Sequence, residues 1–127
     1  MGLQVFASNA LGRDELASGR YTAANPTGGE VAVPRFTLAQ LLPLRPLHEA
    51  MGDVARRARQ RCERADIDTT QVALQWVMSK GASPLCDVIT DSNARAATSC
   101  SDWSLTDAEV SLLDAASTAV DKAKFRW

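Results

Sequence analysis

The chain has 127 residues, of which 46% are hydrophobic and 23% charged, so it is long enough for one globular domain with a modest core. Its formal net charge of −1 lacks the basic excess of a dedicated nucleic-acid or acidic-membrane binder, and we expect neither partner. No apolar stretch approaches the roughly 18 residues needed to span a bilayer, and no secretory leader is recognisable. A soluble protein of the cytoplasm is therefore expected.

The three cysteines, Cys62, Cys86 and Cys100, are odd in number and lack C-x-x-C spacing. This pattern favours reduced intracellular thiols over a disulfide or a metal site. The single histidine, His48, has no serine, cysteine or second histidine at a recognisable motif spacing. The sequence therefore gives no reason to assign it a catalytic role.

The first predicted element is a short apolar strand at residues 3–7, LQVFA. No cap or turn precedes it, so we expect a buried strand with unpaired edges, in a fold that starts further upstream. Such edges also predict self-association. Residues 8–13, SNALGR, follow as a polar turn, because Ser, Asn and Gly favour turns after strands.

A long loop is predicted over residues 22–45, which contain Asn-Pro and Gly-Gly. Loops of this length in compact domains are commonly lids or disordered segments. Pro46 suits the first position of a helix, and apolar residues then recur at helical spacing to about Arg64. The apolar stripe of this helix is Leu47, Ala50, Met51, Val54, Ala58 and Cys62.

The opposite face of the same helix is rich in arginine, with Arg56, Arg57, Arg59, Arg61 and Arg64. Acidic residues lie close enough in the sequence to neutralise part of this positive charge, namely Glu49, Asp53, Glu63 and Asp66. We therefore interpret this run as the solvated outer face of a helix rather than as a nucleic-acid surface.

The most complete unit is a helix followed by a strand in the second half of the chain. Asp68 or Thr69 can cap the first free N–H groups, an inner face through Trp76 follows at helical spacing, and Gly81 supplies a left-handed stop. A short buried strand is predicted at residues 85–89, after a turn of a few residues. This arrangement is half of a βαβ unit and implies a mainly parallel sheet covered by helices.

Two further helices are predicted after this strand. The first begins at about Asn93, in a stretch rich in Ala, Ser and Thr. Thr106 and Glu109 then form a capping box, in which each side chain accepts a hydrogen bond from the backbone N–H of the other residue. The last helix opens there and buries a face that includes Leu113. Residues 121–127 are expected to be a frayed tail.

Several of these motifs resemble the aldo-keto reductases. The run ALQW at residues 73–76, followed by KG and a strand, resembles their late helix-to-strand unit, and W-x-L-T-x-x-E from Trp103 resembles their terminal helix. The resemblance covers residues 1–120 and is nearest to the plant-plastid type, which leaves a plastid location open if a transit peptide lies upstream. It implies an α/β fold, the C-terminal third of a (β/α)8 TIM barrel, helix-rich with two short strands, because a complete barrel needs roughly 200 residues or more.

The resemblance also implies a reaction and a cofactor. Members of the family use NADPH to reduce an aldehyde or ketone to an alcohol, so NADP and a small carbonyl substrate are the implied ligands. The loop after the seventh strand lies over the cofactor pyrophosphate, and the loop and helix after the eighth hold its phosphates and adenine. The implied cofactor-binding residues are Ser8, Leu11, Gly12, Arg13, Thr90 and Asn93.

The second of these loops departs from the family pattern. In a gap-free alignment, Asp87 stands where glycine lets the backbone approach a phosphate, and Ile89 replaces the cation that pairs with the 2′-phosphate. Each change costs on the order of 1–3 kcal/mol of binding free energy. In the alternative alignment Ile89, Thr90 and Asp91 take the place of the motif's Ile-Pro-Gly, and a few residues are deleted.

The catalytic residues of the family are a tyrosine acid supported by lysine, aspartate and histidine, all in the first half of its chain. The one tyrosine here, Tyr21, falls in the loop after the first strand. Without a positioned acid to protonate the developing alkoxide, this chain is expected to be inactive by itself. Two functions stay open: a partial aldo-keto reductase, and a non-catalytic protein-interaction module derived from the barrel.

Overall fold

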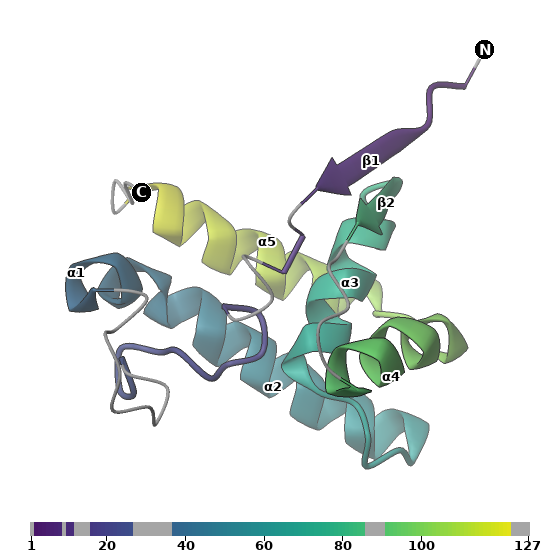
Figure 1. Cartoon of the computed structure of the whole chain (residues 1–127), viewed down its shortest axis with the longest axis horizontal. Coiled ribbons are helices and arrows are strands. Elements are labelled where there is room, and N and C mark those ends of the chain that lie inside the picture. Colours follow the sequence, from purple (N-terminus) through teal and green to yellow (C-terminus); the bar gives the residue numbers. More distant parts are fainter. Residues whose placement is uncertain (1, 9, 12–15, 27–36, 86–90, 123–127) are drawn as a thin grey trace.

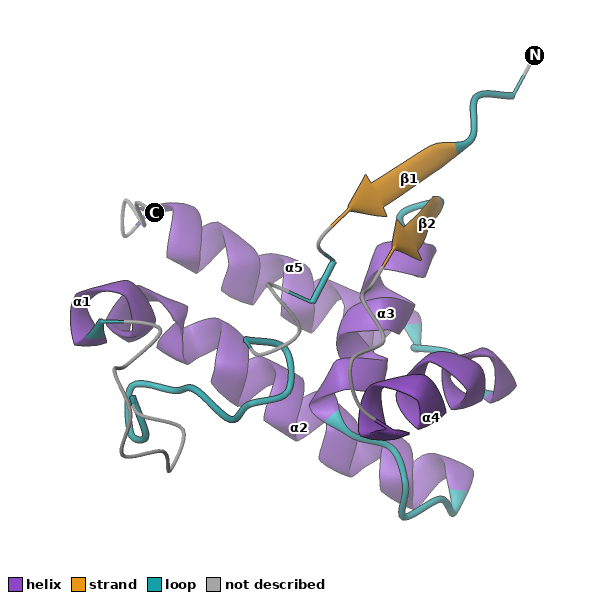
Figure 2. Cartoon of the chain, viewed as in Figure 1, coloured by secondary structure: helices purple, strands orange, loops and turns teal. Residues whose placement is uncertain are grey.

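The computed structural model describes residues 2–8, 10–11, 16–26, 37–85 and 91–122 (Figure 1). They form an α/β structure that is rich in helix and contains one sheet of two short parallel strands (Figure 2). The strands are β1 (Val5–Ser8) and β2 (Ala82–Leu85). The helices are α1 (Leu38–Leu41), η1 (Leu42–Leu44), α2 (Arg45–Cys62), α3 (Thr69–Ser79), α4 (Asp91–Ser99), η2 (Cys100–Asp102) and α5 (Asp107–Lys122). No helix in these ranges is long and apolar enough to cross a membrane.

The parallel pairing that the sequence predicted is confirmed, but the strand positions differ. Val5 lies opposite Ala82, and Ser8 lies opposite Leu85. Strand β2 starts directly after Gly81 and ends where its predicted counterpart began, because the left-handed glycine turns the chain without a separate loop. Residues 86–89 of the predicted strand lie outside the described residues.

Strand β1 is exposed, so the prediction of a buried first strand is wrong. Val5 and Phe6 are each 55% exposed, and Leu3 just before the strand is 94% exposed. The strand packs mainly on β2 and projects away from the helices (Figure 1). An apolar strand is buried only where helices or other strands cover its faces, and no described helix packs extensively on this one.

The two edges of the sheet are not equivalent. Pro84 lies opposite Ala7 in the middle of the ladder. In a parallel ladder, only one of two opposite residues directs its N–H and C=O toward the other strand. Proline has no N–H to donate, so here that residue is Ala7, and the backbone groups of Pro84 point away from β1. The outer edge of β2 therefore lacks one donor. The outer edge of β1 instead presents the N–H and C=O of Phe6.

Helix α3 has the two ends that its sequence predicted. Asp68 is the cap, with extended backbone, and its Oδ1 accepts a hydrogen bond from the Gln71 N–H at 2.9 Å. Gly81 follows the helix with φ of 78°, a conformation in which a side chain would be strained.

The loop predicted over residues 22–45 is interrupted by helix. Residues 38–44 form α1 and η1, and Thr37 opens α1 with a capping box: its Oγ1 accepts from the Gln40 N–H, and Gln40 Oε1 accepts from the Thr37 N–H. Helix α2 then runs to Cys62 and stops because Glu63 adopts left-handed backbone, with φ of 54°. The cap at Thr37 is a local signal that a search for apolar periodicity overlooks.

The capping box of α5 is confirmed. Glu109 Oε2 accepts from the Thr106 N–H at 2.8 Å, and Thr106 Oγ1 accepts from the Glu109 N–H at 3.2 Å. The same carboxylate oxygen accepts from Arg61 Nη2 of α2 at 2.9 Å, so the cap also joins the two helices. The bounds differ slightly from the prediction, since α4 begins at Asp91 and α5 continues to Lys122.

The main core lies between α2, α3 and α5. Each helix contributes one apolar stripe, as its spacing predicts. The most deeply buried of these residues are Val54, Ala58, Ile67, Val72 and Leu113. The sequence predicted that Trp76 lies on the inner face of its helix, but in the structure Trp76 does not lie at the centre of this core. It is partly exposed at the edge of the core, and its Nε1 donates to Asp114 Oδ1 of α5 at 2.9 Å.

A second, smaller core joins the segment after β1 to the helices. Its buried members are Leu16, Tyr21, Leu41, Leu44 and Val120. They come from residues 16–26, from α1 and η1, and from the end of α5. This second core fixes residues 16–26 against the helical part of the molecule.

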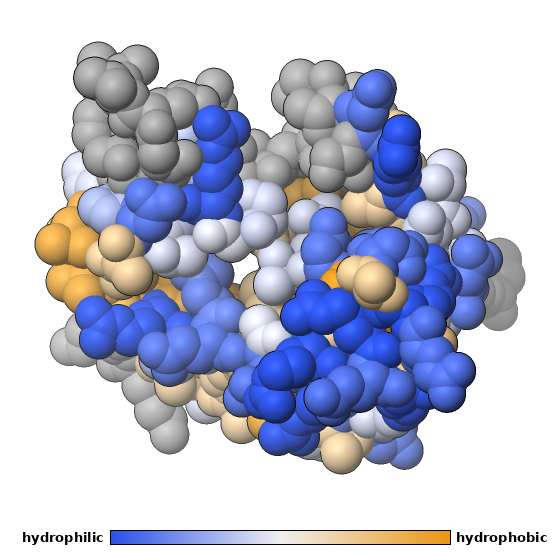
Figure 3. Space-filling model, turned by 90° about the horizontal axis from the view of Figure 1, so that it is seen from below, coloured by the Kyte–Doolittle hydropathy of each residue, from blue (hydrophilic) through white to orange (hydrophobic). Residues whose placement is uncertain are grey.

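The arginine-rich face of α2 is solvated and partly neutralised. Arg56 pairs with Asp53 at 2.6 Å, and Arg64, just after the helix, pairs with Asp66 at 2.6 Å. Arg59 donates to a backbone carbonyl in the connection to α3 at 2.7 Å. Seen from below, much of the surface is hydrophilic (Figure 3). The ion pairs of Arg56 and Arg64 agree with the prediction that nearby carboxylates neutralise part of this face. The bond from Arg59 to a backbone carbonyl was not predicted.

Candidate functional site

The carboxyl ends of β1 and β2 lie side by side at one edge of the sheet. Ser8 lies opposite Leu85, and the Ala10 N–H donates to the Leu85 carbonyl at 3.5 Å. Helix α4 is the next element after β2 and begins at Asp91. In α/β proteins with parallel strands, ligands bind outside this edge, where the loops after the strands converge.

The predicted cofactor residues divide into three groups. Ser8 is exposed at the carboxyl edge of the sheet. Leu11 is only 2% exposed and packs in the main core, so its side chain is not available to a pyrophosphate. Asn93 lies in the first turn of α4, and the placement of its side chain is not described. Gly12, Arg13 and Thr90 lie outside the described residues.

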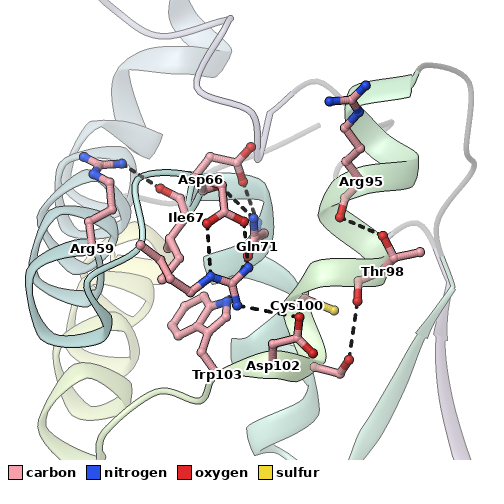
Figure 4. A network of polar contacts seen from close by, with 12 residues as sticks. Arg59, Asp66, Ile67, Gln71, Arg95, Thr98, Cys100, Asp102 and Trp103 are labelled. Atoms are coloured by element: carbon pink, nitrogen blue, oxygen red, sulfur yellow. Dashed lines mark hydrogen bonds and ion pairs between the residues drawn. The ribbon is translucent and has the colours of Figure 1, made fainter.

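A polar hollow lies between the start of α3 and α4. Its volume is about 370 Å³, and it is lined by Asp66, Asp68, Gln71, Arg95, Ala96 and Ser99. Arg95 projects from α4, while Asp66 lies in the segment that leads into α3 (Figure 4). The lining of the hollow therefore includes one basic residue and two acidic residues, on neighbouring elements.

Two buried amides of α3 lie at or near this hollow, and Gln71 is one of its lining residues. Gln71 is 3% exposed; its Nε2 donates to the Asp66 carbonyl at 2.8 Å, and its Oε1 accepts from Trp103 Nε1 at 2.9 Å (Figure 4). One turn later, Gln75 Nε2 donates to the carbonyls of Cys100 and Trp103. These bonds tie α3 to the segment after α4. The two sides of the hollow are therefore held at a fixed separation.

The carboxylates of the hollow are already engaged. Arg64 donates to both oxygens of Asp66, with Nε–Oδ1 at 3.0 Å and Nη2–Oδ2 at 2.6 Å, and this bond holds the pKa of Asp66 below its usual range. Asp68 uses Oδ1 to cap α3. Arg95 has no side-chain hydrogen bond or ion pair within the described ranges. Arg95 is thus the cationic residue of the hollow without a described partner.

These groups suit a ligand that carries an anionic group at one end and an amine at the other. The guanidinium can hold a phosphate or carboxylate in two parallel bonds, and it can also stack on a planar ring. The free oxygen atoms of Asp68 and Ser99 can accept from an amine. No cluster of three metal-binding side chains occurs among the residues that the structure describes. A nucleotide, with an amine-bearing ring and an anionic group, matches this combination.

Arg95 and the hollow were not predicted from the sequence. The family pattern has its phosphate-binding cation at the position of Ile89, and Ile89 is aliphatic. A signal was present, because Arg95 is the one basic residue of α4. Asp66 and Gln71 could not be found in this way, since only the tertiary structure brings them beside α4. No family model, no curated protein and no solved structure matches this chain.

Proposed function

We propose that this chain is the C-terminal part of an aldo-keto reductase barrel and that the hollow between α3 and α4 takes the adenosine end of NADP. The reaction of the complete barrel is then the NADPH-dependent reduction of an aldehyde or ketone to an alcohol. The observation that carries the proposal is the position of Arg95: it is an open guanidinium on the helix that follows the second of two parallel strands. The family resemblance assigns the cofactor's phosphates and adenine to that helix and the loop before it.

The roles of the individual groups follow from their chemistry. Arg95 forms a two-bond contact with the 2′-phosphate that distinguishes NADP from NAD. Asp68 accepts from the exocyclic amine of adenine, and Ser8 lies at the edge where the pyrophosphate passes. Asp66 opposes the anion less than a free carboxylate would, because Arg64 already neutralises it. Asp87 and Ile89 still weaken the site by the sequence argument.

Carbonyl reduction needs residues that this chain does not supply. Its one tyrosine, Tyr21, is 1% exposed in the second core, so it cannot protonate a substrate at the strand edge. We expect the isolated chain to bind NADPH no tighter than about millimolar, an affinity of roughly 4 kcal/mol, and to show no reductase activity.

A titration with two small ligands tests the cofactor site. Adenosine 2′,5′-bisphosphate and ADP differ in the 2′-phosphate, so the ratio of their dissociation constants reports the contact with that group. In a chain carrying Asp87→Gly and Ile89→Lys, we expect binding strong enough to measure by NMR and a preference for the bisphosphate. Adding Arg95→Gln should reduce this preference by about 10-fold or more, since one charge-assisted pair contributes about 1.5–3 kcal/mol. Arg56→Gln, on the exposed face of α2, is the matched control and should leave it unchanged.

A preference for the bisphosphate that survives Arg95→Gln would contradict the proposed role of the hollow. Micromolar NADPH binding by the unmodified chain would instead contradict the argument that Asp87 and Ile89 weaken the site. The family assignment itself is tested by sequencing the transcript upstream of Met1. An open reading frame that carries the tyrosine, lysine, aspartate and histidine would support it, and the joined protein should oxidise NADPH when an aldehyde is added. A joined protein that folds but shows no NADPH oxidation would contradict it.

The alternative, a non-catalytic interaction module, is favoured by one observation. Strand β1 exposes Val5 and Phe6, and no other described strand pairs with its outer edge, which could therefore accept an incoming strand. In that case, nucleotide binding should stay undetectable in the Asp87→Gly and Ile89→Lys chain. The two functions are therefore separated by the same titration.

A further inference from the structure

His48 forms a wall between two hollows at the start of α2. One is an apolar cavity of about 260 Å³, whose lining includes Leu16, Met51 and Trp76. The other is an open hollow of about 370 Å³ beside residues 22–24, which are part of the segment that follows β1. The ring thus lies where this segment meets the helices, next to the second core.

The ring is poorly equipped to carry a charge. Its Nδ1 atom is buried and has no hydrogen-bond partner in the part of the chain that the structure describes. Burial lowers the pKa of His48 below 6.5, and this effect is larger than the opposing one of the Leu16 backbone nearby. Protonation would place a donor at Nδ1 with no acceptor, inside a largely apolar surrounding.

Few charged groups surround the ring. Among the described residues that line the two hollows, only Arg45 and Glu49 are charged, and both are exposed residues of α2 itself. They have opposite signs, and neither is among the causes that shift the pKa of His48. The residues that face the ring from α3, from η1 and from the segment after β1 are uncharged. Within the described ranges, no neighbouring element therefore supplies a carboxylate that would stabilise the imidazolium.

We propose that His48 is an acid-sensitive latch that holds residues 16–26 closed on α1 and α2 while its ring is neutral. The segment is suited to move as a unit, because Thr22 and Asn25 exchange two backbone hydrogen bonds, at 3.2 and 3.0 Å, that do not depend on the helices. Buried side chains hold it to the helices: Leu16 and Tyr21 pack in the second core and Ala17 packs in the main core, and Leu16 lines the same cavity as His48. Protonation of the ring favours the open segment, in which both ring nitrogens reach water.

The direction follows from the two protonation equilibria. In the open state the ring has an ordinary histidine pKa near 6.5, while in the closed state its pKa is lower. Above 6.5 both states are neutral and the closed state keeps its full stability. Between pH 6.5 and the pKa of the closed state, the open state binds the proton more readily than the closed state. The equilibrium constant for closure therefore falls by up to tenfold for each pH unit in this range.

Amide hydrogen exchange and NMR test the latch. The chain contains one histidine, so the titration of its ring protons is unambiguous. We expect that ring to titrate below 6.5 and the protection factors of residues 16–26 to fall as the pH drops below 6.5, while those of α3 stay constant. His48→Gln keeps a polar side chain that does not titrate, and it should abolish the pH dependence. Glu49→Gln, on the same helix, should retain it.

Each outcome decides the proposal. A ring that titrates at or above 6.5 in the unmodified chain would overturn it without any variant. Protection factors of residues 16–26 that do not change between pH 7 and pH 5 would also overturn it, as would pH dependence that persists in His48→Gln. Loss of pH dependence in His48→Gln, with retention in Glu49→Gln, would support it.

Discussion

Replacing Gln75 by methionine should lower the free energy of unfolding by about 2–4 kcal/mol. The Gln75 side chain is 7% exposed, and its Nε2 donates to the carbonyl of Trp103 at 2.5 Å and to that of Cys100. Methionine has nearly the same length, so it leaves no cavity but removes both donors. Loss of each of these buried hydrogen bonds costs up to about 1–3 kcal/mol, and burial of the apolar side chain offsets part of this.

The loss is large compared with the roughly 5–15 kcal/mol of a typical domain. Urea unfolding followed by circular dichroism measures it, and the melting temperature should fall by roughly 10 °C. Gln60→Met on the exposed face of α2 is the matched control and should change stability by less than about 0.5 kcal/mol. If Gln75→Met lost less than about 1 kcal/mol, the segment after α4 would not depend on this amide, and the rigid hollow inferred from it would lose its support.

Other substitutions test separate parts of the structure. Trp76→Ala should cost about 2–3 kcal/mol, less than the 3–5 kcal/mol of a fully buried aromatic, because the ring is partly exposed; urea unfolding would contradict this with a loss of 4 kcal/mol or more. The hydrogen bond from Lys80 and the one from Trp76 lower the pKa of Asp114, so their stabilisation is present above the ordinary pKa and disappears as the pH falls through the folded-state value. Asp114→Asn should therefore reduce the acid sensitivity of unfolding between about pH 4 and pH 2, and an unchanged acid profile would show that this pair is not responsible. Phe6→Lys should make the chain monomeric in sedimentation if β1 mediates self-association, and oligomers that persist would place the contact elsewhere.

The sequence determined the features that depend on neighbours along the chain. The cap at Asp68, the left-handed stop at Gly81 and the capping box at Thr106 each involve groups within a few residues of one another, so their residue types were sufficient. The apolar stripe of α2 was readable for the same reason, because helical periodicity repeats locally. Parallel pairing of the strands was also predicted, because strands that alternate with helices along the chain usually form parallel sheets.

Only the tertiary structure decided which groups meet across elements. The hydrogen bond from Trp103 to Gln71 joins residues 32 apart, and no spacing rule predicts it. The exposure of Phe6 depends on what covers β1, which its own pattern cannot report. Arg95 became a candidate because α4 packs beside Asp66, and His48 because the segment after β1 folds back over its ring. Local hydrogen bonds and periodicity are encoded over a few residues, whereas burial and charge pairing are properties of the assembled surface, which forms only when distant segments pack.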